Sequence, residues 1–172
     1  FKSILEHNSK QDLNWFFNEL IYSRNKIDYK IIQAKKTNDV IDVTIKNVGD
    51  AKVPISISGY QKNKLISKNW IENQSDIFTF SIQNDSITKF VLNDTYEIPE
   101  LNNNNNSYKL KNRFLGNRKI RFTFFKDIEN PKYNQIFFVP TAEYNLYDGL
   151  LFGMKFNNKS IIVKPFIYDI TP

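Results

Sequence analysis

The sequence contains no cysteine and a single histidine, His7, among its 172 residues. The absence of cysteine excludes disulfides, thiolate metal sites and a cysteine nucleophile. A zinc peptidase motif of the HExxH type needs two histidines one helical turn apart, and Glu6-His7 has no second histidine four residues further on. A Ser-His-Asp triad would also have to use His7, which we expect at the surface or at a helix end. We therefore expect no catalytic residue, no metal ligand and no cofactor in this chain.

Glycine and long hydrophobic runs are also scarce. Five dispersed glycines cannot form the glycine-rich loop that cradles a phosphate group. No stretch of eighteen apolar residues occurs, so we expect no transmembrane helix. Hydrophobic residues nevertheless make up 41% of the chain and aromatic residues 15%, which predicts a packed core. Because phenylalanine, tyrosine and β-branched residues favour strands, we predict a mainly β protein.

The stretch from Ser9 to Ile32 has the pattern of an amphipathic helix that leads into a first strand. Five large apolar side chains recur at helical spacing and form one stripe: Leu13, Phe16, Phe17, Leu20 and Ile21. Ser9 followed by Asp12 is a variant of the capping box that opens a helix. A helix this short is stable only when another surface covers its stripe. We therefore expect residues 1–27 to be the helical end of a preceding domain, with these five residues packed on that domain.

Residues 28–97 carry short strand signals separated by turn residues. Apolar and polar residues alternate in the segments that we expect to be strands: residues 29–35, 40–48, 53–58, 65–72, 77–82 and 87–92. Asn47-Val48-Gly49-Asp50 supplies turn chemistry after the second segment. Such a series predicts a small antiparallel β-sandwich, in which we expect Trp70 to be a core residue.

Residues 98–118 differ in kind from the segments around them. Residues 102–106 are all asparagine, and without an apolar anchor we expect an Asn-rich and basic linker. Asp94, Glu97 and Glu100 lie beside Pro99 and cannot share a helix face, so a solvated acidic loop fits them better than a calcium site. Aromatic-rich segments predict further strands in residues 119–172, at residues 119–125, 135–140, 150–156 and 160–168.

The net charge of +6 is confined to the C-terminal part. Residues 1–107 hold 13 basic and 13 acidic residues, whereas residues 108–172 hold 11 basic and 5 acidic residues. Six basic residues cluster with no acid among them: Lys109, Lys111, Arg113, Arg118, Lys119 and Arg121. Nucleic-acid binding, protection of an exposed strand edge and approach to a membrane surface all remain open for this cluster. We place the strand edge first and the membrane second, and we expect no nucleic-acid partner.

Two stretches resemble a known enzyme family. The segment from Asp12 to Ile31 resembles the end of the helical region in aminopeptidase N-like zinc metallopeptidases of the gluzincin type, where it closes the catalytic part before a β-sandwich domain. The matching residues are Asp12, Trp15, Phe16, Phe17 and Tyr29. Residues 37–60 are similar to the opening of an immunoglobulin-like module, which implies that residues 28–97 form an immunoglobulin-like sandwich.

A third stretch, residues 140–158, is similar to the segment that leads into a C-terminal outer-membrane β-barrel in large Bacteroidetes-type proteins with this peptidase domain. The residues of that similarity are Tyr144, Asn145, Tyr147, Asp148, Gly149 and Gly153. It implies that residues 119–172 begin a membrane-associated β region and that the protein belongs to the bacterial cell envelope. The zinc ligands and catalytic glutamate of the family map to no residue here, so the resemblance implies zinc only in the parent protein.

These patterns leave three functions to consider. We expect an accessory C-terminal region of a zinc aminopeptidase-like protein, which packs on the preceding catalytic domain, acts as a spacer after it and associates with the envelope through its C-terminal part. The alternative is a stand-alone cell-surface or periplasmic module that binds protein or glycan through Tyr60, Tyr144 and Tyr147. An enzyme with carboxylate chemistry in its second part ranks third.

Overall fold

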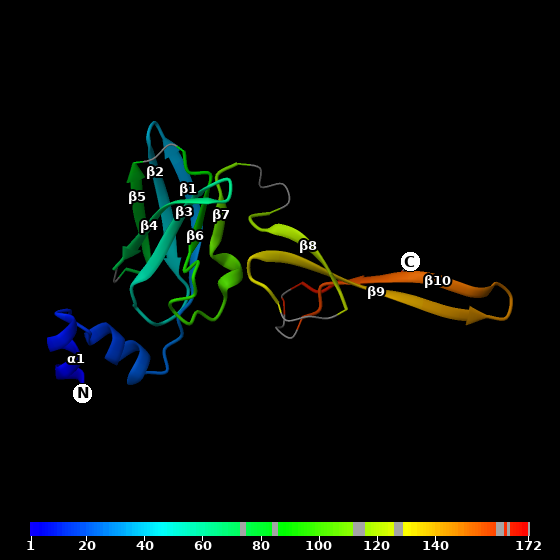
Figure 1. Ribbon diagram of the computed structural model, residues 1–172, viewed down its shortest axis with the longest axis horizontal. Helices are drawn as coiled ribbons and strands as arrows, with labels where there is room; N and C mark the ends of the chain where they lie inside the picture. Colours follow the sequence, from blue (N-terminus) through cyan, green and yellow to red (C-terminus); the bar gives the residue numbers. More distant parts are fainter. Residues whose placement is uncertain are drawn as a thin grey trace. The chain divides into compact units, whose positions relative to one another are not determined.

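The computed structural model divides into two compact units, residues Phe1–Arg113 and Phe114–Pro172 (Figure 1). It describes residues 1–72, 75–83, 86–111, 116–125, 129–160, 164 and 166–171. A short helical segment precedes an antiparallel β-sandwich, and further strands follow in the second unit. The predicted mainly β fold is therefore confirmed.

Residues 1–22 form two short helices, which we call the helical cap. α1 (Lys2–Ser9) is an α-helix, and η1 (Phe16–Ile21) is a π-helix. The single helix expected to start at Ser9 is wrong, because Lys10 adopts the left-handed φ of 56° that ends α1. Asp12 forms a local turn before the second helix, where its Oδ1 accepts a hydrogen bond from the Asn14 N–H at 2.8 Å.

Seven strands of the first unit form two sheets in which every pair is antiparallel. One sheet has the order β1-β2-β5 and the other has the order β4-β3-β6-β7. A seven-stranded pair of antiparallel sheets is the architecture of immunoglobulin-like sandwiches. The strand bounds are β1 (Tyr29–Thr37), β2 (Val40–Asn47), β3 (Ile55–Gln61), β4 (Lys64–Ile71), β5 (Ile77–Gln83), β6 (Lys89–Leu92) and β7 (Ser107–Lys109).

The core lies between these two sheets and consists mainly of β-branched residues. β2 shows the clearest alternation, because Ile41, Val43 and Ile45 are fully buried while the residues between them are half-buried. Ile55 and Ile57 of β3 meet them from the other sheet within one cluster of buried residues. The turn predicted after β2 is also present, since Asn47 Oδ1 accepts a hydrogen bond from the Gly49 N–H at 3.1 Å.

The expected linker over residues 98–118 is wrong in its first half, because that part belongs to the sandwich. η2 (Asn103–Asn105) is a short 3-10 helix, and Asn106 is 2% exposed. Directly afterwards β7 pairs with β6, with Ser107 opposite Val91. The asparagine run therefore leads directly into the seventh strand of the sandwich. Of the rest of the expected linker, residues 112–115 lie outside the described residues.

Trp70, expected in the core, is 52% exposed. It lies opposite Ser56 on β4, which is an edge strand. Neighbouring residues of a strand point to opposite faces, and Ile55 and Ile57 are the β3 residues that enter the core cluster. Trp70 shares the other face with Ser56, so the prediction assigned it to the wrong side of the sheet.

The second unit contains one sheet with the order β11-β10-β9-β8. β9 (Tyr133–Asn145) and β10 (Gly149–Asn157) form a long antiparallel hairpin, and β8 (Lys119–Phe124) runs parallel to β9. The strand expected over residues 160–168 is wrong for its described part, because β11 (Asp169–Ile170) begins only after it. Residues 161–163 and 165 of that expectation lie outside the described residues.

The buried Tyr29 joins β1 to the segment that enters β3. Its hydroxyl group donates to the Val53 carbonyl at 3.0 Å and accepts from the Val53 N–H at 3.2 Å. Tyr29→Phe removes this group and leaves both backbone partners buried without it. We expect the free energy of unfolding to fall by about 1–3 kcal/mol, measured by urea denaturation.

Tyr22→Phe is the matched control, because the Tyr22 side chain is 72% exposed. We expect its free energy of unfolding to stay within about 0.5 kcal/mol of the unsubstituted chain. Equal losses for the two variants would show that the Tyr29 hydroxyl group does not hold the sandwich together.

Candidate functional site

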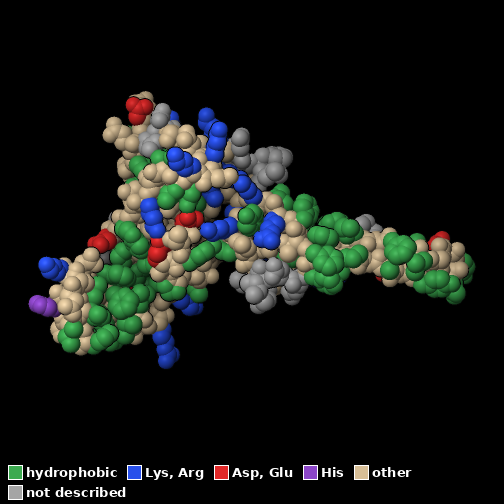
Figure 2. Space-filling view, in the orientation of Figure 1, with side chains coloured by type: hydrophobic (Ala, Val, Ile, Leu, Met, Phe, Trp, Pro, Cys, Tyr) green, Lys and Arg blue, Asp and Glu red, His purple; other side chains and the backbone are tan. Residues whose placement is uncertain are grey.

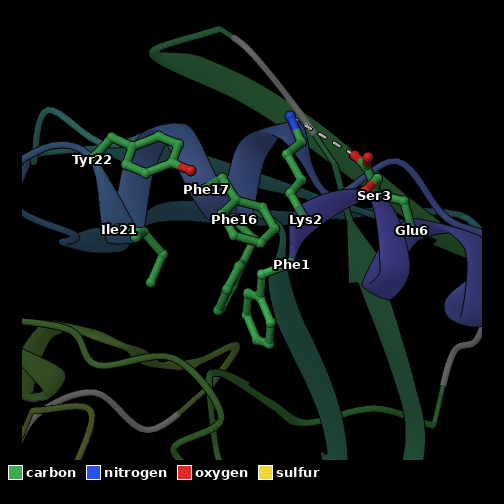
Figure 3. A pocket seen from close by; sticks show the side chains of 8 residues that line it. All are labelled: Phe1, Lys2, Ser3, Glu6, Phe16, Phe17, Ile21 and Tyr22. Atoms are coloured by element: carbon green, nitrogen blue, oxygen red, sulfur yellow. Dashed lines mark ion pairs between the residues drawn. The ribbon is translucent and has the colours of Figure 1, made fainter.

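The helical cap carries an apolar groove of about 720 Å³ on one side (Figure 3). Aromatic and aliphatic side chains dominate its lining: Phe1, Phe16, Phe17, Ile21 and Tyr22, together with Lys2, Ser3 and Glu6. Phe1 is 85% exposed, Ile21 53% and Tyr22 72%. Large apolar side chains gathered on one surface in this way mark sites of interaction. We call this surface the cap groove.

Phe17 fills the centre of the helical cap and holds its two helices together. It is only 4% exposed, and its ring meets those of Phe1 and Tyr22 at centroid distances of 6.4 and 5.9 Å. The Lys2 ammonium group lies 5.7 Å from the centre of the same ring. Such aromatic and cation–π contacts add specific geometry to simple burial. The groove is therefore built on a packed aromatic centre.

The other side of the helical cap is fixed to the sandwich. Trp15 and Leu20 pack against the core cluster of the first unit. They are five positions apart in the sequence, as expected from the wider turn of the π-helix in η1. A regular α-helix would have placed Leu20 on the predicted stripe. One face of the helical cap thus packs on the sandwich, and the other face forms the cap groove.

The structure divides the five residues that we predicted to pack on a preceding domain. Phe16, Phe17 and Ile21 line the groove, and Phe17 is almost wholly buried. Leu20 packs against the sandwich core, and Leu13 is half-buried. Helical spacing alone missed two groove residues, Phe1 and Tyr22. Both are aromatic and stand at the ends of the segment, so the composition of the stretch was the available signal.

The polar groups of the groove are engaged with one another. Lys2 Nζ lies 3.9 Å from Glu6 Oε1, and the same carboxylate oxygen accepts from the Leu13 N–H at 3.2 Å. His7 is exposed in the last turn of α1, at the helix end where we expected it. This arrangement offers an apolar contact surface with a charged edge, suited to recognition of another folded surface.

The acidic residues near the end of β6 do not converge on a common point. Asp94 accepts a hydrogen bond from the Tyr60 hydroxyl group, and Glu97 pairs with Lys68. Burial and the contact with Asp94 raise the pKa of Tyr60 to about 12. Burial opposes ionisation of Glu97, but hydrogen bonds from Lys68 and Thr95 outweigh it and lower its pKa to about 2. These groups bind one another and stabilise the outer face of the sheet.

Glu100 is half-buried and hydrogen-bonded, in contrast to the solvated loop that we predicted. Its Oε1 accepts from the Tyr29 N–H at 2.9 Å, and its Oε2 accepts from the side-chain amides of Asn93 and Asn106 at 2.9 and 2.5 Å. Burial is the largest influence on its pKa and raises it, although the three hydrogen bonds act in the opposite direction. Asn93 extends the network, since its amide donates to the Ile98 carbonyl at 2.6 Å. Glu100 is a structural acceptor.

Two further classes of site are missing from the described part of the chain. No group of three or more histidine, aspartate or glutamate side chains there could hold a metal ion. Nor is any helix of the described residues long and apolar enough to cross a membrane.

The sheet of the second unit has one face formed by apolar residues. Facing residues of an antiparallel pair point the same way, and every second residue repeats that direction. Along the hairpin the facing pairs are Tyr144 with Leu150, Ala142 with Phe152 and Pro140 with Met154. We call this side the apolar face. Figure 2 shows hydrophobic side chains gathered along β9 and β10, and others over the helical cap.

The apolar face continues at the base of the hairpin. Phe138 lies opposite Phe156, and β8 adds Phe122 and Phe124 beside Ile136 and Phe138. Phe152 is 79% exposed and Phe122 is 62% exposed. Phenylalanines this exposed across one sheet face mark an interaction surface. Of the aromatic residues proposed for a binding module, Tyr144 and Tyr147 are 73% and 95% exposed.

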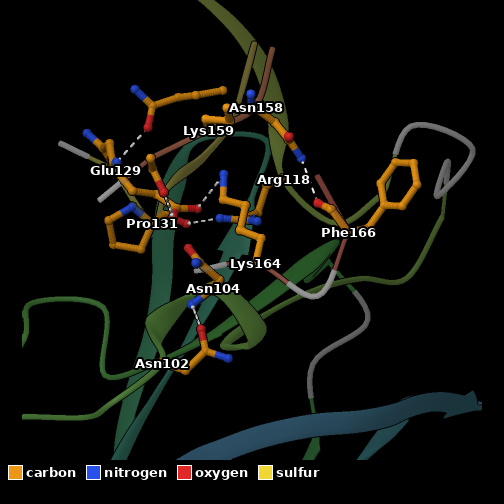
Figure 4. A network of polar contacts seen from close by, with 12 residues as sticks. Asn102, Asn104, Arg118, Glu129, Pro131, Asn158, Lys159, Lys164 and Phe166 are labelled. Carbon is orange, nitrogen blue, oxygen red and sulfur yellow. Dashed lines mark hydrogen bonds and ion pairs between the residues drawn. The ribbon is translucent and has the colours of Figure 1, made fainter. Parts of the chain in front are cut away.

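The opposite face of this sheet is buried at the base of the hairpin. Phe137 is fully buried there and Gln135 is 5% exposed. Beside this face, Lys164 pairs with Glu129 at 3.3 Å, and Arg118 donates to the Pro131 carbonyl at 3.3 Å (Figure 4). Burial lowers the pKa of Arg118, and the charge of Glu129 opposes that shift. Further along the hairpin this face is open too, because Glu143 and Leu151 are exposed.

The predicted basic cluster lies partly on this sheet. Lys119 and Arg121 belong to β8, which is an edge strand, so their positions agree with protection of a strand edge. Arg121 also stacks on the Tyr133 ring at 5.4 Å. Arg113 lies outside the described residues.

Glu100 makes the stability of the first unit depend on pH. Because its pKa is raised on folding, the folded protein holds the proton more tightly than the unfolded chain does. Its contribution is fully present below the ordinary value of 4.5 and is lost as the pH rises through the raised pKa. Glu100→Gln cannot ionise, so urea denaturation between about pH 4.5 and 8 should find a smaller loss of stability in the variant than in the unsubstituted chain.

Glu97→Gln is the control, because the pKa of Glu97 is shifted in the opposite direction from that of Glu100. The pKa of Glu97 is lowered to about 2, so its contribution is present above its ordinary value of 4.5 and is lost as the pH falls. The fall in stability above pH 4.5 should therefore persist in Glu97→Gln. If Glu100→Gln kept that fall unchanged, another group would be responsible for it.

Two apolar surfaces thus stand out: the cap groove in the first unit and the apolar face in the second. Both expose several large apolar side chains. Searches against protein families, curated proteins and solved structures found no match for this chain.

Proposed function

We propose that this chain is a non-catalytic accessory module, which uses the cap groove to hold a neighbouring folded domain against its β-sandwich. The observation that carries the proposal is the division of the helical cap into two faces. Trp15 and Leu20 fix it to the sandwich core, while Ile21 and Tyr22 stay exposed around the groove. A segment held on one side and open on the other can join two bodies.

The resemblance of residues 12–31 to the end of the helical region in aminopeptidase N-like zinc peptidases supports a preceding catalytic-type domain as the occupant of the groove. Phe16, one of the residues of that resemblance, lines the groove. In this proposal zinc and catalysis belong to the catalytic domain of the parent protein. The sandwich spaces that domain from the second unit, in an envelope protein.

A stand-alone binding module is the second candidate, and the exposure of Tyr144 and Tyr147 favours it. Both tyrosines lie at the tip of the β9–β10 hairpin. Exposed tyrosines are common in surfaces that recognise proteins. Tyr60, the third residue of that hypothesis, is engaged with Asp94 instead.

The first test compares this chain with the product of its complete gene. Zinc content and hydrolysis of aminoacyl amides are measured for both proteins. The proposal expects zinc and activity in the complete product and neither in the 172-residue chain. If the complete product contained no zinc and had no activity, the peptidase hypothesis would be rejected. The binding module would then be the first candidate function.

The second test concerns the groove. Ile21→Asp places a charge among Phe1, Phe16 and Tyr22 and disfavours burial of that surface against a second domain. In the complete product we expect faster limited proteolysis at the junction and a lower melting temperature of the catalytic domain. Because Ile21 is 53% exposed, the melting temperature of the 172-residue chain should change by less than about 2 °C.

Asn18→Asp is the matched control for this substitution. Asn18 lies in the same helical segment, is exposed and does not line the groove. It should leave both the proteolysis and the melting of the complete product unchanged. The docking role fails if Ile21→Asp and Asn18→Asp behave alike there.

A further inference from the structure

The β9–β10 hairpin extends beyond the strands that flank it. The pairing of β8 with β9 ends at Phe124 opposite Phe138, and the pairing of β11 with β10 begins at Phe156. Residues 139–155 therefore form a two-stranded arm with no neighbouring strand among the described residues. A bare two-stranded hairpin is only marginally stable in water. This arm needs a cover for its apolar face.

The unpaired backbone groups of the arm bear on whether lipid or protein covers its apolar face. Both edges of the arm carry N–H and C=O groups that no strand of the described residues pairs. In the hydrocarbon of a bilayer each such group costs several kcal/mol, whereas at a protein–protein contact in water the edges can stay hydrated. For the strands that the structure describes, the open edges favour a protein that covers the apolar face and leaves the edges in solvent.

The area of the face is that of one side of an ordinary protein interface. Seven of its side chains are between 40% and 79% exposed: Phe122, Phe124, Tyr144, Leu150, Phe152, Met154 and Ile170. A fully exposed aromatic side chain offers about 150–250 Å², so these residues together present roughly 800 Å². A standard interface buries about 800 Å² on each partner.

The apolar face carries no charged side chain among the strand residues that share it, which suits contact with a second copy. Glu143, Lys119 and Arg121 belong to the same strands but lie on the opposite face. Two copies stacked through the apolar face therefore bring no like charges of that face together. Met154 lies midway along the face and so falls near the two-fold axis.

We propose that the apolar face of the second unit binds the same face of a second copy of this chain. Stacked sheets of this kind lie about 10 Å apart and bury their facing side chains. The contact is isologous, as in most two-fold dimers. It involves the second unit alone, so it is independent of the role of the cap groove.

The first experiment measures the mass of the 172-residue chain in solution by sedimentation equilibrium. We expect about twice the 20.4 kDa of one chain. Phe152→Asp puts a charge on the apolar face and should weaken dimerisation by at least about 100-fold. The control is Leu151→Asp, which changes the next residue of the same strand on the opposite face and should leave the dimer intact.

A second experiment keeps the proposal testable if Phe152→Asp folds poorly. Because the chain has no cysteine, Met154→Cys introduces a single thiol near the two-fold axis. A bis-maleimide of about 10 Å, the spacing of stacked sheets, should then link two copies efficiently. Leu151→Cys lies on the opposite face and should give little linked product. Equal linking of both variants overturns the proposal.

Lipid is the rival occupant of this face, and vesicle flotation tests it. Vesicles of phosphatidylcholine and phosphatidylglycerol in equal parts are mixed with the chain. If the chain is monomeric and floats with the vesicles, and Phe152→Asp abolishes flotation, the apolar face binds a membrane surface. That result overturns the dimer. A monomer that does not float also overturns it. A dimer dissociated by Phe152→Asp and not by Leu151→Asp supports it.

Discussion

The first unit depends on the hydrogen bonds of Tyr29. Its hydroxyl group binds both backbone groups of Val53, and its own N–H donates to Glu100. These contacts join the start of β1, the entry to β3 and the segment after β6, which are far apart in the sequence. A buried polar group that lost its partners would cost more than the contact itself contributes, so these three parts are held in one arrangement. The position of the asparagine run depends on it too, because Asn106 binds the same carboxylate.

The two units differ in how their apolar side chains are covered. In the first, polar side chains close the outside of the sandwich, and the apolar groups of the helical cap are divided between the core and the groove. In the second, one face of a single sheet is buried only at the base of the hairpin, and the other face exposes large apolar side chains. A single sheet has no second layer of its own to cover that face. The chain therefore combines a sandwich that encloses its own core with a sheet that exposes one apolar face.

Local sequence patterns predicted the strands well and the less regular segments poorly. The alternation in β2 and β5 placed those strands to within a residue or two, because a period of two depends only on neighbouring residues. It also says which residues share a face, but not which face is inward on an edge strand, and Trp70 was misplaced for that reason. The left-handed Lys10, which ends α1, has no sequence signal of its own. Glu100 and the asparagine run looked solvated because their partners, Tyr29 and β6, are distant in the sequence.

The pairing of β7 with β6 also determines when the sandwich can form during synthesis. Val91 of β6 needs Ser107, and Phe90 needs Tyr108, so the second sheet stays incomplete until the residues after the asparagine run have left the ribosome. Until then β6 presents an unpaired edge and the apolar side chains of the core to the cytosol or to the secretion machinery. Chains in that state are open to strand exchange and to capture by chaperones. The five asparagines, which carry no apolar group, let the chain emerge to that point without adding to the exposed hydrophobic surface.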